Sequence, residues 1–480
     1  MRALGLLLSL WLAAVGHGQY WKAIGLGTVD AREVQTLFGD EASDRLLAGG
    51  TFQYIRNVED TVLGLGQAAW NGLRWDSVAH RLQSFIGNST QQTYWFLRYQ
   101  GVLYCCGNFA YYDENNNLNG TFARLNEATN RWGSLGCDIP GMAGIATLVP
   151  KEPGTVLYAT GYQDPLCGLP TSCVFRYDGT SFSEWLPFQQ IPPEPNNSVG
   201  YVFDFRGMTY ITGNFPDPQS NGTASLLRYN GSSWETVPGW NTISSIKEFS
   251  IHNDTLYVAG TFRVATGAPG DLIARFDGTT WDDMGGGMLY EPVPMSSAIL
   301  AMTWYHGELW VAGFFTRAGD IAAESIAKWN GHQWCSLPAD FQGQQPNATV
   351  VRIVDMAVWR DSLYICGGFR WINGVPIKQV AQWLGGDVEE ACSTPVGVAE
   401  PRMFPTLHVY PNPSEDLLTI QGLGSGAFHF VVKDALGRTV LEQVSGTHLL
   451  DVSALPGGSY TIACFEHAGK VIGQSRFIRP

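Results

Sequence analysis

The sequence predicts an all-β protein, a seven-bladed β-propeller followed by a small C-terminal β-sandwich. Three observations support this prediction. The 480 residues include 56 Gly and 17 Trp but only 15% charged residues, which suits short strands and tight turns better than long helices. An apolar run that ends in glycine recurs about every fifty residues, and most repeats then contain an Asn-Gly or Asp-Gly hairpin turn. A period of this length, built from strands that pack only on the neighbouring repeats, is typical of a propeller.

The first residues predict a secretory signal peptide at 1–18. The stretch MRALGLLLSLWLAAVGHG has one arginine, an apolar segment, and small residues at Gly16 and Gly18, just before Gln19. The alternative is a membrane anchor, but the apolar segment is shorter than the roughly 18 residues that a span requires, and no transmembrane segment is expected. The mature chain is therefore predicted to be exported to a compartment in which disulfides persist.

The propeller is predicted to occupy 19–392. The aligned glycines of its repeats are Gly50, Gly107, Gly161, Gly213, Gly260, Gly313 and Gly367. An aromatic residue follows each hairpin turn, and its recurrence predicts packing between blades: Trp75, Trp132, Phe182, Trp234, Trp281 and Trp334. The last repeat, VAQWLGGDVEEAC, has no such fourth strand, whereas the mature N-terminus, QYWKAIGLG at 19–27, reads as one. The N-terminus is therefore expected to complete the seventh blade and close the ring.

The repeat LYCCGNF…FARLNEATNRWGSLG is similar to a kelch repeat, whose blades carry a glycine pair after the second strand and a spaced Tyr and Trp. The pair is present at Gly49–Gly50 and Gly367–Gly368, and the other repeats have a single glycine. The resemblance covers 19–392. It implies the fold and not the function, because propellers include enzymes, binding proteins and scaffolds.

The cysteines agree with export. Eight of the nine precede residue 393, and Cys464 stands alone near the end. Cys167 and Cys173 bracket a short loop and are the predicted disulfide, while the connectivity of the others stays open. The adjacent Cys105 and Cys106 are expected to face opposite sides of a strand. No CxxC occurs and the spacing fits no zinc site, so no metal is expected.

A Pro-containing linker at 393–406 precedes a tail at 407–480, whose short alternating strands and Pro and Gly turns predict a small β-sandwich. The tail resembles the type A C-terminal sorting domain of the type IX secretion system of Bacteroidota. The matching residues are Tyr410, Pro411, Asn412, Pro413, Asp416, Asp434, Gly437, Leu455, Pro456, Gly457, Gly458, Tyr460 and Phe477. The alternative is a sandwich with a binding role of its own.

This resemblance implies that the tail is a sorting signal for secretion. The protein would cross the inner membrane on its signal peptide, pass through the periplasm, and cross the outer membrane through the type IX translocon. The tail would usually be removed there, and the protein would be secreted or attached to the outer-membrane surface. The implied partners are the type IX secretion machinery and its sorting protease.

No catalytic residue, metal or cofactor is predicted. The chain has neither GxSxG nor HExxH. His252 and His306 precede repeated strands and are interpreted as solvated turn residues. Asp113, Asn115 and Asn117 are spaced as in a calcium loop, but no glycine or closing glutamate follows where an EF-hand requires them. The net charge of −14 and the absence of a basic patch argue against a nucleic-acid partner.

Three acidic residues fall on first strands: Asp204, Glu248 and Asp355. First strands line the central channel of a propeller, where these carboxyls could meet as the pair of a hydrolase. A solvated channel lining is the simpler interpretation. A binding or scaffold role is therefore the predicted function, and a carbohydrate-active hydrolase or lyase that acts from the funnel is the alternative.

Four aromatic residues are the candidate ligand contacts, because they lie in predicted loops and do not recur from blade to blade. They are Tyr111, Tyr112, Tyr290 and Trp371. Flat aromatic faces offer apolar area at a small cost in conformational entropy, which suits a glycan or protein ligand. The alternative is that these side chains fix their own loops to the rim.

Overall fold

The computed structural model divides into two compact units, Met1–Pro395 and Val396–Pro480, which are described separately. The predicted signal peptide, nearly all of the predicted linker, Asn115, Cys167, Gly437 and the Cys173 side chain lie outside the described residues. The structure describes residues 20–29, 32–79, 82, 91–113, 117–135, 147–151, 156–164, 169, 172–192, 197–220, 222–240, 245–263, 271–290, 297–337, 339–343, 351–385, 390–393, 407–421, 423, 428–434, 439–465 and 471–480.

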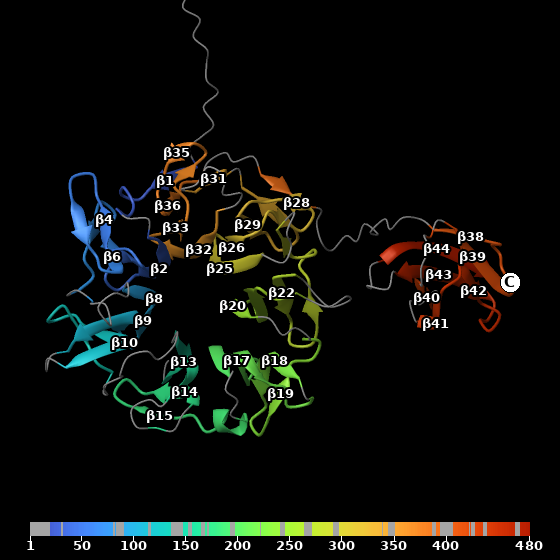
Figure 1. Ribbon diagram of the computed structural model, residues 1–480, viewed down its shortest axis with the longest axis horizontal. Helices are drawn as coiled ribbons and strands as arrows, with labels where there is room; N and C mark the ends of the chain where they lie inside the picture. The colour runs from blue at the N-terminus through green and yellow to red at the C-terminus, as the bar shows by residue number, and fades with distance from the viewer. Residues whose placement is uncertain are drawn as a thin grey trace, which may run out of the picture. The chain divides into compact units, whose positions relative to one another are not determined.

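The first unit is a β-propeller of antiparallel sheets (Figure 1), and the predicted all-β class is confirmed. We number the blades by the repeat that forms them. Blade 1 is β2 (Val34–Asp40), β3 (Arg45–Gly50), β6 (Gln67–Trp70) and β7 (Trp75–Asp76). Blade 2 is β8 (Gln92–Tyr99), β9 (Val102–Tyr112), β10 (Leu118–Asn126) and β11 (Arg131–Gly133). Blade 3 is β12 (Thr147–Lys151), β13 (Val156–Asp164), β14 (Ser172–Tyr177) and β15 (Phe182–Glu184).

The remaining blades repeat this meander. Blade 4 is β16 (Ser198–Phe205), β17 (Met208–Pro216), β18 (Thr223–Tyr229) and β19 (Trp234–Thr236). Blade 5 is β20 (Ile246–His252), β21 (Thr255–Gly260), β22 (Ile273–Phe276) and β23 (Trp281–Asp282). Blade 6 is β25 (Ala298–Tyr305), β26 (Glu308–Phe314), β29 (Ile326–Trp329) and β30 (Trp334–Ser336). Blade 7 is β32 (Ile353–Trp359), β33 (Ser362–Gly367), β36 (Val380–Trp383) and β1 (Trp21–Ala23).

The first strands of the blades follow one another around a closed ring. Each contacts the first strand of the next blade, and β32 of the last blade contacts β2 of the first. The N-terminal strand β1 forms the outer strand of blade 7, with Trp21 opposite Trp383. The pairing expected from the sequence between the two ends of the repeat region is therefore present, and it covers the free edge of β36.

The repeated glycine is explained by a close approach of two strands. In blade 5, Gly260 lies opposite Ile246, and the register then shifts by one residue before Glu248. A Cβ atom on Gly260 would overlap the carbonyl oxygen of Ser245. The corresponding carbonyl blocks a Cβ at the aligned positions Gly50, Gly107, Gly213, Gly313 and Gly367. The glycine thus allows the second strand to approach a bulge that each of these blades carries in its first strand.

The fourth-strand tryptophans join adjacent blades, as the sequence indicated, and they do so with hydrogen bonds as well as packing. The Trp75 indole N–H donates to the carbonyl of Ile24 (3.2 Å), and that of Trp334 donates to Met284 (2.6 Å). Trp234 and Trp281 donate in the same way to the carbonyls of Pro187 and Pro238. Each of these acceptors ends the blade before the tryptophan, so the repeated side chain ties one blade to the next.

Several connections between second and third strands form hairpins of their own. They are β4 (Tyr54–Arg56) with β5 (Thr61–Leu63), β27 (Arg317–Ala318) with β28 (Ile321–Ala322), and β34 (Trp371–Ile372) with β35 (Val375–Pro376). The segment that enters the blade pairs with the hairpin: β24 (Met288–Leu289) with β27, and β31 (Phe341–Gln342) with β34. The strands β27 and β34 are therefore paired on both sides and make fixed supports for side chains.

A disulfide closes the end of the propeller. Cys335 and Cys392 are bonded, and β37 (Ala391–Cys392) adds a fifth strand to the outer edge of blade 6. Ser393 continues this contact, since its N–H donates to the Trp334 carbonyl at 2.7 Å. Cys105, Cys106, Cys366 and Cys464 are buried, and Cys105 and Cys366 are free thiols. The disulfide predicted between Cys167 and Cys173 falls outside the described side chains.

The second unit is a β-sandwich, as predicted. One sheet contains β38 (His408–Tyr410), β39 (Leu417–Gln421) and β42 (Leu449–Asp451). The other contains β41 (Thr439–Ser445), β40 (Phe428–Lys433), β43 (Gly458–Phe465) and β44 (Val471–Arg479). Both sheets contribute to one core, which includes Leu418, Ile420, Phe430, Val432, Leu450, Ile462 and Phe477.

The motif residues of this unit hold its last strand. The Asn412 side chain accepts from the N–H of Ile478 (2.9 Å) and donates to the carbonyl of Arg476 (3.0 Å). Tyr460 stacks on Phe477 and donates to the Pro456 carbonyl at 2.6 Å. A Cβ on Gly457 would lie only 2.8 Å from the carbonyl oxygen of Pro480. The spacing of these motif residues in the sequence therefore has a structural cause: they hold the C-terminal strand in place.

Substituting Trp21 with alanine tests closure of the ring. Trp21 is 1% exposed and packs edge-on against Trp383 (4.8 Å between ring centroids). We expect Trp21→Ala to reduce the free energy of unfolding by about 3–5 kcal/mol, as for other buried tryptophans, in urea titrations followed by fluorescence. Lys22, the exposed neighbour on β1, provides the matched control, Lys22→Ala. Equal stabilities for the two variants would mean that β1 does not close the ring.

Candidate functional site

Two of the four candidate aromatics are packing residues. Tyr111 is 3% exposed, and its hydroxyl donates to the carbonyl of Phe122 at 2.8 Å. Tyr290 is 8% exposed and stacks on Phe314, with 4.5 Å between ring centroids. The sequence placed Tyr111 in a loop, whereas β9 continues through Tyr112, so the two neighbours face opposite sides of a strand. Tyr111 and Tyr290 are therefore not available to a ligand.

The other two aromatics are exposed. Tyr112, at the end of β9, is 48% exposed, and Trp371, the first residue of β34, is 37% exposed. Trp371 lies opposite Gln342 of β31 on one side and Pro376 of β35 on the other. Its backbone is thus fixed on both sides while its ring contacts solvent, which is the arrangement expected of a preorganised contact residue.

A second candidate site lies inside the ring, where the first strands carry their bulges. The residue after the bulge occupies an equivalent position in each of these blades, and we call this set the inner layer: Thr36, Trp95, Tyr201, Glu248, Ala301 and Asp355. Trp95 and Tyr201 belong to blades 2 and 4, yet their rings meet edge-on at 6.2 Å. Contacts between blades that are not neighbours show that the inner layer reaches across the ring.

The Asp355 carboxylate acts on Glu248 across blade 6. Burial raises the pKa of Glu248 well above its usual range, and the Asp355 carboxylate raises it further. Blade 6 has Ala301 at the equivalent position of its first strand. The Tyr201 hydroxyl donates to the Lys247 carbonyl at 2.8 Å, and its interaction with Glu248 acts in the opposite direction on the Glu248 pKa.

Asp355 is the more easily ionised member of this pair. Burial raises its pKa to about 6, while hydrogen bonds from the N–H groups of Leu37 and Met356 (2.8 Å each) and from Thr36 act in the opposite direction. The pKa of Glu248 is raised by burial and by the Asp355 charge together, whereas the rise at Asp355 is limited by the hydrogen bonds that its carboxylate accepts. Two carboxyls whose environments separate their pKa values are what general acid–base chemistry requires.

The other acidic and histidine candidates have structural roles. Asp204, on the first strand of blade 4, accepts a hydrogen bond from Thr209 at 2.6 Å. His306 lies 3.0 Å from Asp361 of the next blade, and His252 stacks on Trp304 at 3.7 Å between ring centroids. His306 lies in a turn, as interpreted from the sequence, whereas His252 is the last residue of β20 and stacks on a residue of β25.

Asp113, from the segment that resembled a calcium site, is hydrogen-bonded to residues on the far side of that segment. The Asp113 carboxylate accepts hydrogen bonds from the Asn117 N–H (2.8 Å) and from the Asn119 side-chain amide (3.2 Å). These donors occupy Asp113 oxygens that a calcium ion would need.

Comparisons with known proteins identify the tail. Residues 408–476 match the family described as the secretion system C-terminal sorting domain. No curated protein sequence matches the chain. The sorting domain implies contact with the secretion machinery, export, and either release or attachment at the cell surface. The helices in the described part of the chain lack the length and apolarity needed to cross a membrane.

Similar solved structures are distant. PorZ of Porphyromonas gingivalis, described as an essential surface component of its type IX secretion system, is 13% identical over 96% of this chain and 85% of its own (TM-score 0.28). The extracellular domain of BT3049 from B. thetaiotaomicron is 10% identical over 96% and 58% (TM-score 0.42). The GH74 xyloglucanase of Xanthomonas campestris is 15% identical over 76% and 55% (TM-score 0.47). At these values the matches carry no inference about function.

The charge state of the inner layer can be tested with Glu248→Gln. Native Glu248 keeps its proton to a higher pH than in the unfolded chain, so wild-type stability falls as the pH rises above the ordinary glutamate value of 4.5. Glutamine has no proton to lose. We therefore expect equal unfolding free energies near about pH 4 and a growing advantage for the variant toward about pH 8, measured by urea titration. A difference that does not change with pH would show that Glu248 is not destabilised in its ionised form.

Proposed function

We propose that this protein is an exported β-propeller that works by binding, or as a scaffold, at the cell surface or in secreted form, with a glycan or protein as its ligand. The observation that carries the proposal is the pair of exposed aromatic side chains, Tyr112 and Trp371, on backbone that β-pairing holds fixed. Rigid, solvent-facing rings lose little entropy when they cover a sugar or peptide.

The proposal includes the architecture. We take the ring as seven kelch-like blades, closed by the N-terminal strand, because the repeats share the glycine, the hairpin turn and the Trp or Phe of a common unit. A closed ring of blades leaves only short outer strand edges unpaired, which favours a stable extracellular scaffold. The fold itself does not specify the ligand.

The proposal also includes the route of export. The N-terminal 18 residues act as a signal peptide, the tail at 407–480 is recognised by the type IX machinery, and its sorting protease cuts in the linker at 393–406. The disulfide between Cys335 and Cys392 and the hydrogen bonds of Ser393 support this division, because they fasten the end of the propeller just before the linker.

A second candidate function is a carbohydrate-active enzyme that acts from the ring interior. Glu248 and Asp355 favour it, since their separated pKa values would supply one proton donor and one base in the same layer. Turnover of an oligosaccharide, lost in both Glu248→Gln and Asp355→Asn, would establish this function in place of simple binding.

The binding role is tested with Tyr112→Ala and Trp371→Ala. Each substitution should weaken binding to a ligand found on a glycan array by roughly 1 kcal/mol or more, because a flat contact surface is removed, and should leave the melting temperature nearly unchanged. Tyr111→Ala is the matched control, since this adjacent ring is buried and its loss should lower stability. Variants of Tyr112 and Trp371 that melt early and bind normally would identify these rings as loop anchors.

The export role is tested by ending the chain after Ser393. The shortened chain keeps Cys392 and the fifth strand of blade 6, so the propeller should fold and show the tryptophan fluorescence of the full chain, whose 17 Trp all precede this point. In a host with the type IX system we expect it to accumulate in the periplasm, as judged by cell fractionation. Delivery of the shortened chain to the cell surface at the normal level would refute the assigned role of the tail.

A further inference from the structure

One position of the third strand carries a cation in blades 2 to 6: Arg124, Arg176, Arg228, Arg275 and Lys328. In blade 4, Arg228 pairs with Glu235, which lies directly opposite on the fourth strand, at 2.6 Å. In blade 5, Arg275 pairs in the same way with Asp282 at 3.3 Å. Lys328 of blade 6 lies opposite Cys335 and pairs instead with Glu308 and Glu390. Arg176 of blade 3 lies opposite Ser183. A carboxylate thus pairs with this cation in blades 4, 5 and 6.

Blade 2 has the cation without the carboxylate. Gly133 lies opposite Arg124 on the fourth strand, and among the described residues no carboxylate forms an ion pair with the Arg124 guanidinium. A Cβ on Gly133 would meet only the Arg124 carbonyl oxygen, at 3.8 Å, so the backbone does not require glycine here. The missing side chain leaves space where blades 4 and 5 place an acid.

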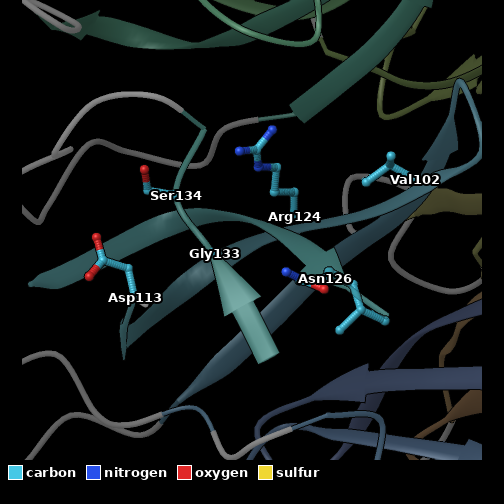
Figure 2. Close-up of a pocket in the computed structure, with 7 residues that line it drawn as sticks. Val102, Asp113, Arg124, Asn126, Gly133 and Ser134 are labelled. Carbon is cyan, nitrogen blue, oxygen red and sulfur yellow. The ribbon is translucent and has the colours of Figure 1, made fainter. Parts of the chain in front are cut away.

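This space is part of a cavity of about 330 Å³, comparable to small-ligand sites in proteins. Figure 2 shows its side chains arranged around Gly133, with the Arg124 guanidinium, the Ser134 hydroxyl, the Asn126 amide and the Asp113 carboxylate among them. Val102 and Leu125 add apolar surface. The cavity thus combines one cation with several hydrogen-bonding groups and a small apolar wall.

The charge of Arg124 reaches two neighbouring phenols. It works against the rise in pKa that burial causes at the Tyr104 phenol of blade 2 and at the Tyr177 phenol of blade 3. The Arg124 side chain itself is exposed. Water and salt therefore screen its attraction for a bound anion, which should be strongest at low ionic strength.

We propose that this cavity binds the carboxylate-bearing sugar of an acidic glycan, such as a uronic acid residue; this inference rests on the proposed function as a glycan-binding protein. The planar guanidinium of Arg124 matches a carboxylate with two parallel hydrogen bonds. The Asn126 side-chain oxygen accepts from the N–H groups of Ala128 and Thr129, which orients its NH₂ group as a donor for a ring hydroxyl. Val102 and Leu125 can contact the C–H face of the ring.

Asp113 sets the selectivity of the site. Its carboxylate is held by the Asn117 N–H and the Asn119 amide and lines the same cavity as Arg124. An acidic group accepts hydrogen bonds from hydroxyls but repels a second negative charge. The site should therefore favour a singly charged, hydroxyl-rich ligand over a doubly charged phosphate ester.

The experiment compares the full chain with variants in a titration against two probes, tetragalacturonic acid and neutral galactotetraose, at low salt. Gly133→Glu should place a carboxylate opposite Arg124, as Glu235 lies opposite Arg228, and so block the cavity and neutralise its cation. We expect at least about a tenfold loss of affinity for the acidic probe in Gly133→Glu and in Arg124→Ala. Arg176→Ala, at the same strand position in blade 3, is the control and should bind normally.

The outcomes separate this inference from the function on which it rests. Binding of the acidic probe that is unchanged in both Gly133→Glu and Arg124→Ala would place the glycan site elsewhere and leave the proposed function standing. A wild-type protein that binds only neutral glycans would overturn the inference in the same way. A wild-type protein that binds no glycan at all would overturn both. Two variants are used because a folding defect in one, seen in its melting temperature, leaves the other to decide.

Discussion

The whole propeller depends on the close approach of the repeated glycine to the first strand of its blade. At Gly260, and at the aligned glycines of the other blades named above, any side chain would overlap a carbonyl oxygen of the first strand. Only with this space free can the second strand pair with a first strand that bulges, and the bulge sets the position of the next residue. One small residue per repeat therefore determines both how the blade is built and which side chains, such as Glu248, reach the interior of the ring.

The repeated tryptophan of the fourth strand joins its blade to a neighbouring one. Each fourth-strand tryptophan that donates to a carbonyl of the preceding blade satisfies its indole N–H and fills the seam with one side chain. A blade has no partner for these groups on its own, so the ring is stable only when complete. This explains why both ends of the repeat region are fastened, β1 by pairing with β36 and β37 by the Cys335–Cys392 disulfide.

Features that recur could be predicted from the sequence, and features that depend on a single blade or on ring closure could not. The strands, turns and the pairing of the N-terminus with the last repeat follow from periodicity, because each copy supports the interpretation of the others. The sequence did not distinguish the buried Tyr111 from the exposed Tyr112, because the repeat does not predict that β9 continues past its glycine as far as Tyr112. The effect of the Asp355 charge on Glu248 acts across blade 6, and only the geometry of the ring brings the charge of one blade near the carboxyl of another. The Cys335–Cys392 pairing depends on where the chain runs after the last repeat, and no local pattern shows it.

In a repeat protein the departures from the repeat are the places to look for chemistry, because the shared positions are committed to packing and pairing. The inner layer illustrates this: its positions are equivalent in backbone but differ in side chain, and the two acids stand where other blades have Thr36, Trp95 or Ala301. Gly133 is a departure of the opposite kind, since it removes a carboxylate that Glu235 and Asp282 supply elsewhere. Asp355 also accepts hydrogen bonds from Leu37 and Thr36 of blade 1, so it contributes to the seam between the last and first blades. Glu248, in contrast, costs free energy to ionise inside the ring, and an arginine that faces a cavity gives up an available ion pair. These two departures are better explained by something that the propeller binds.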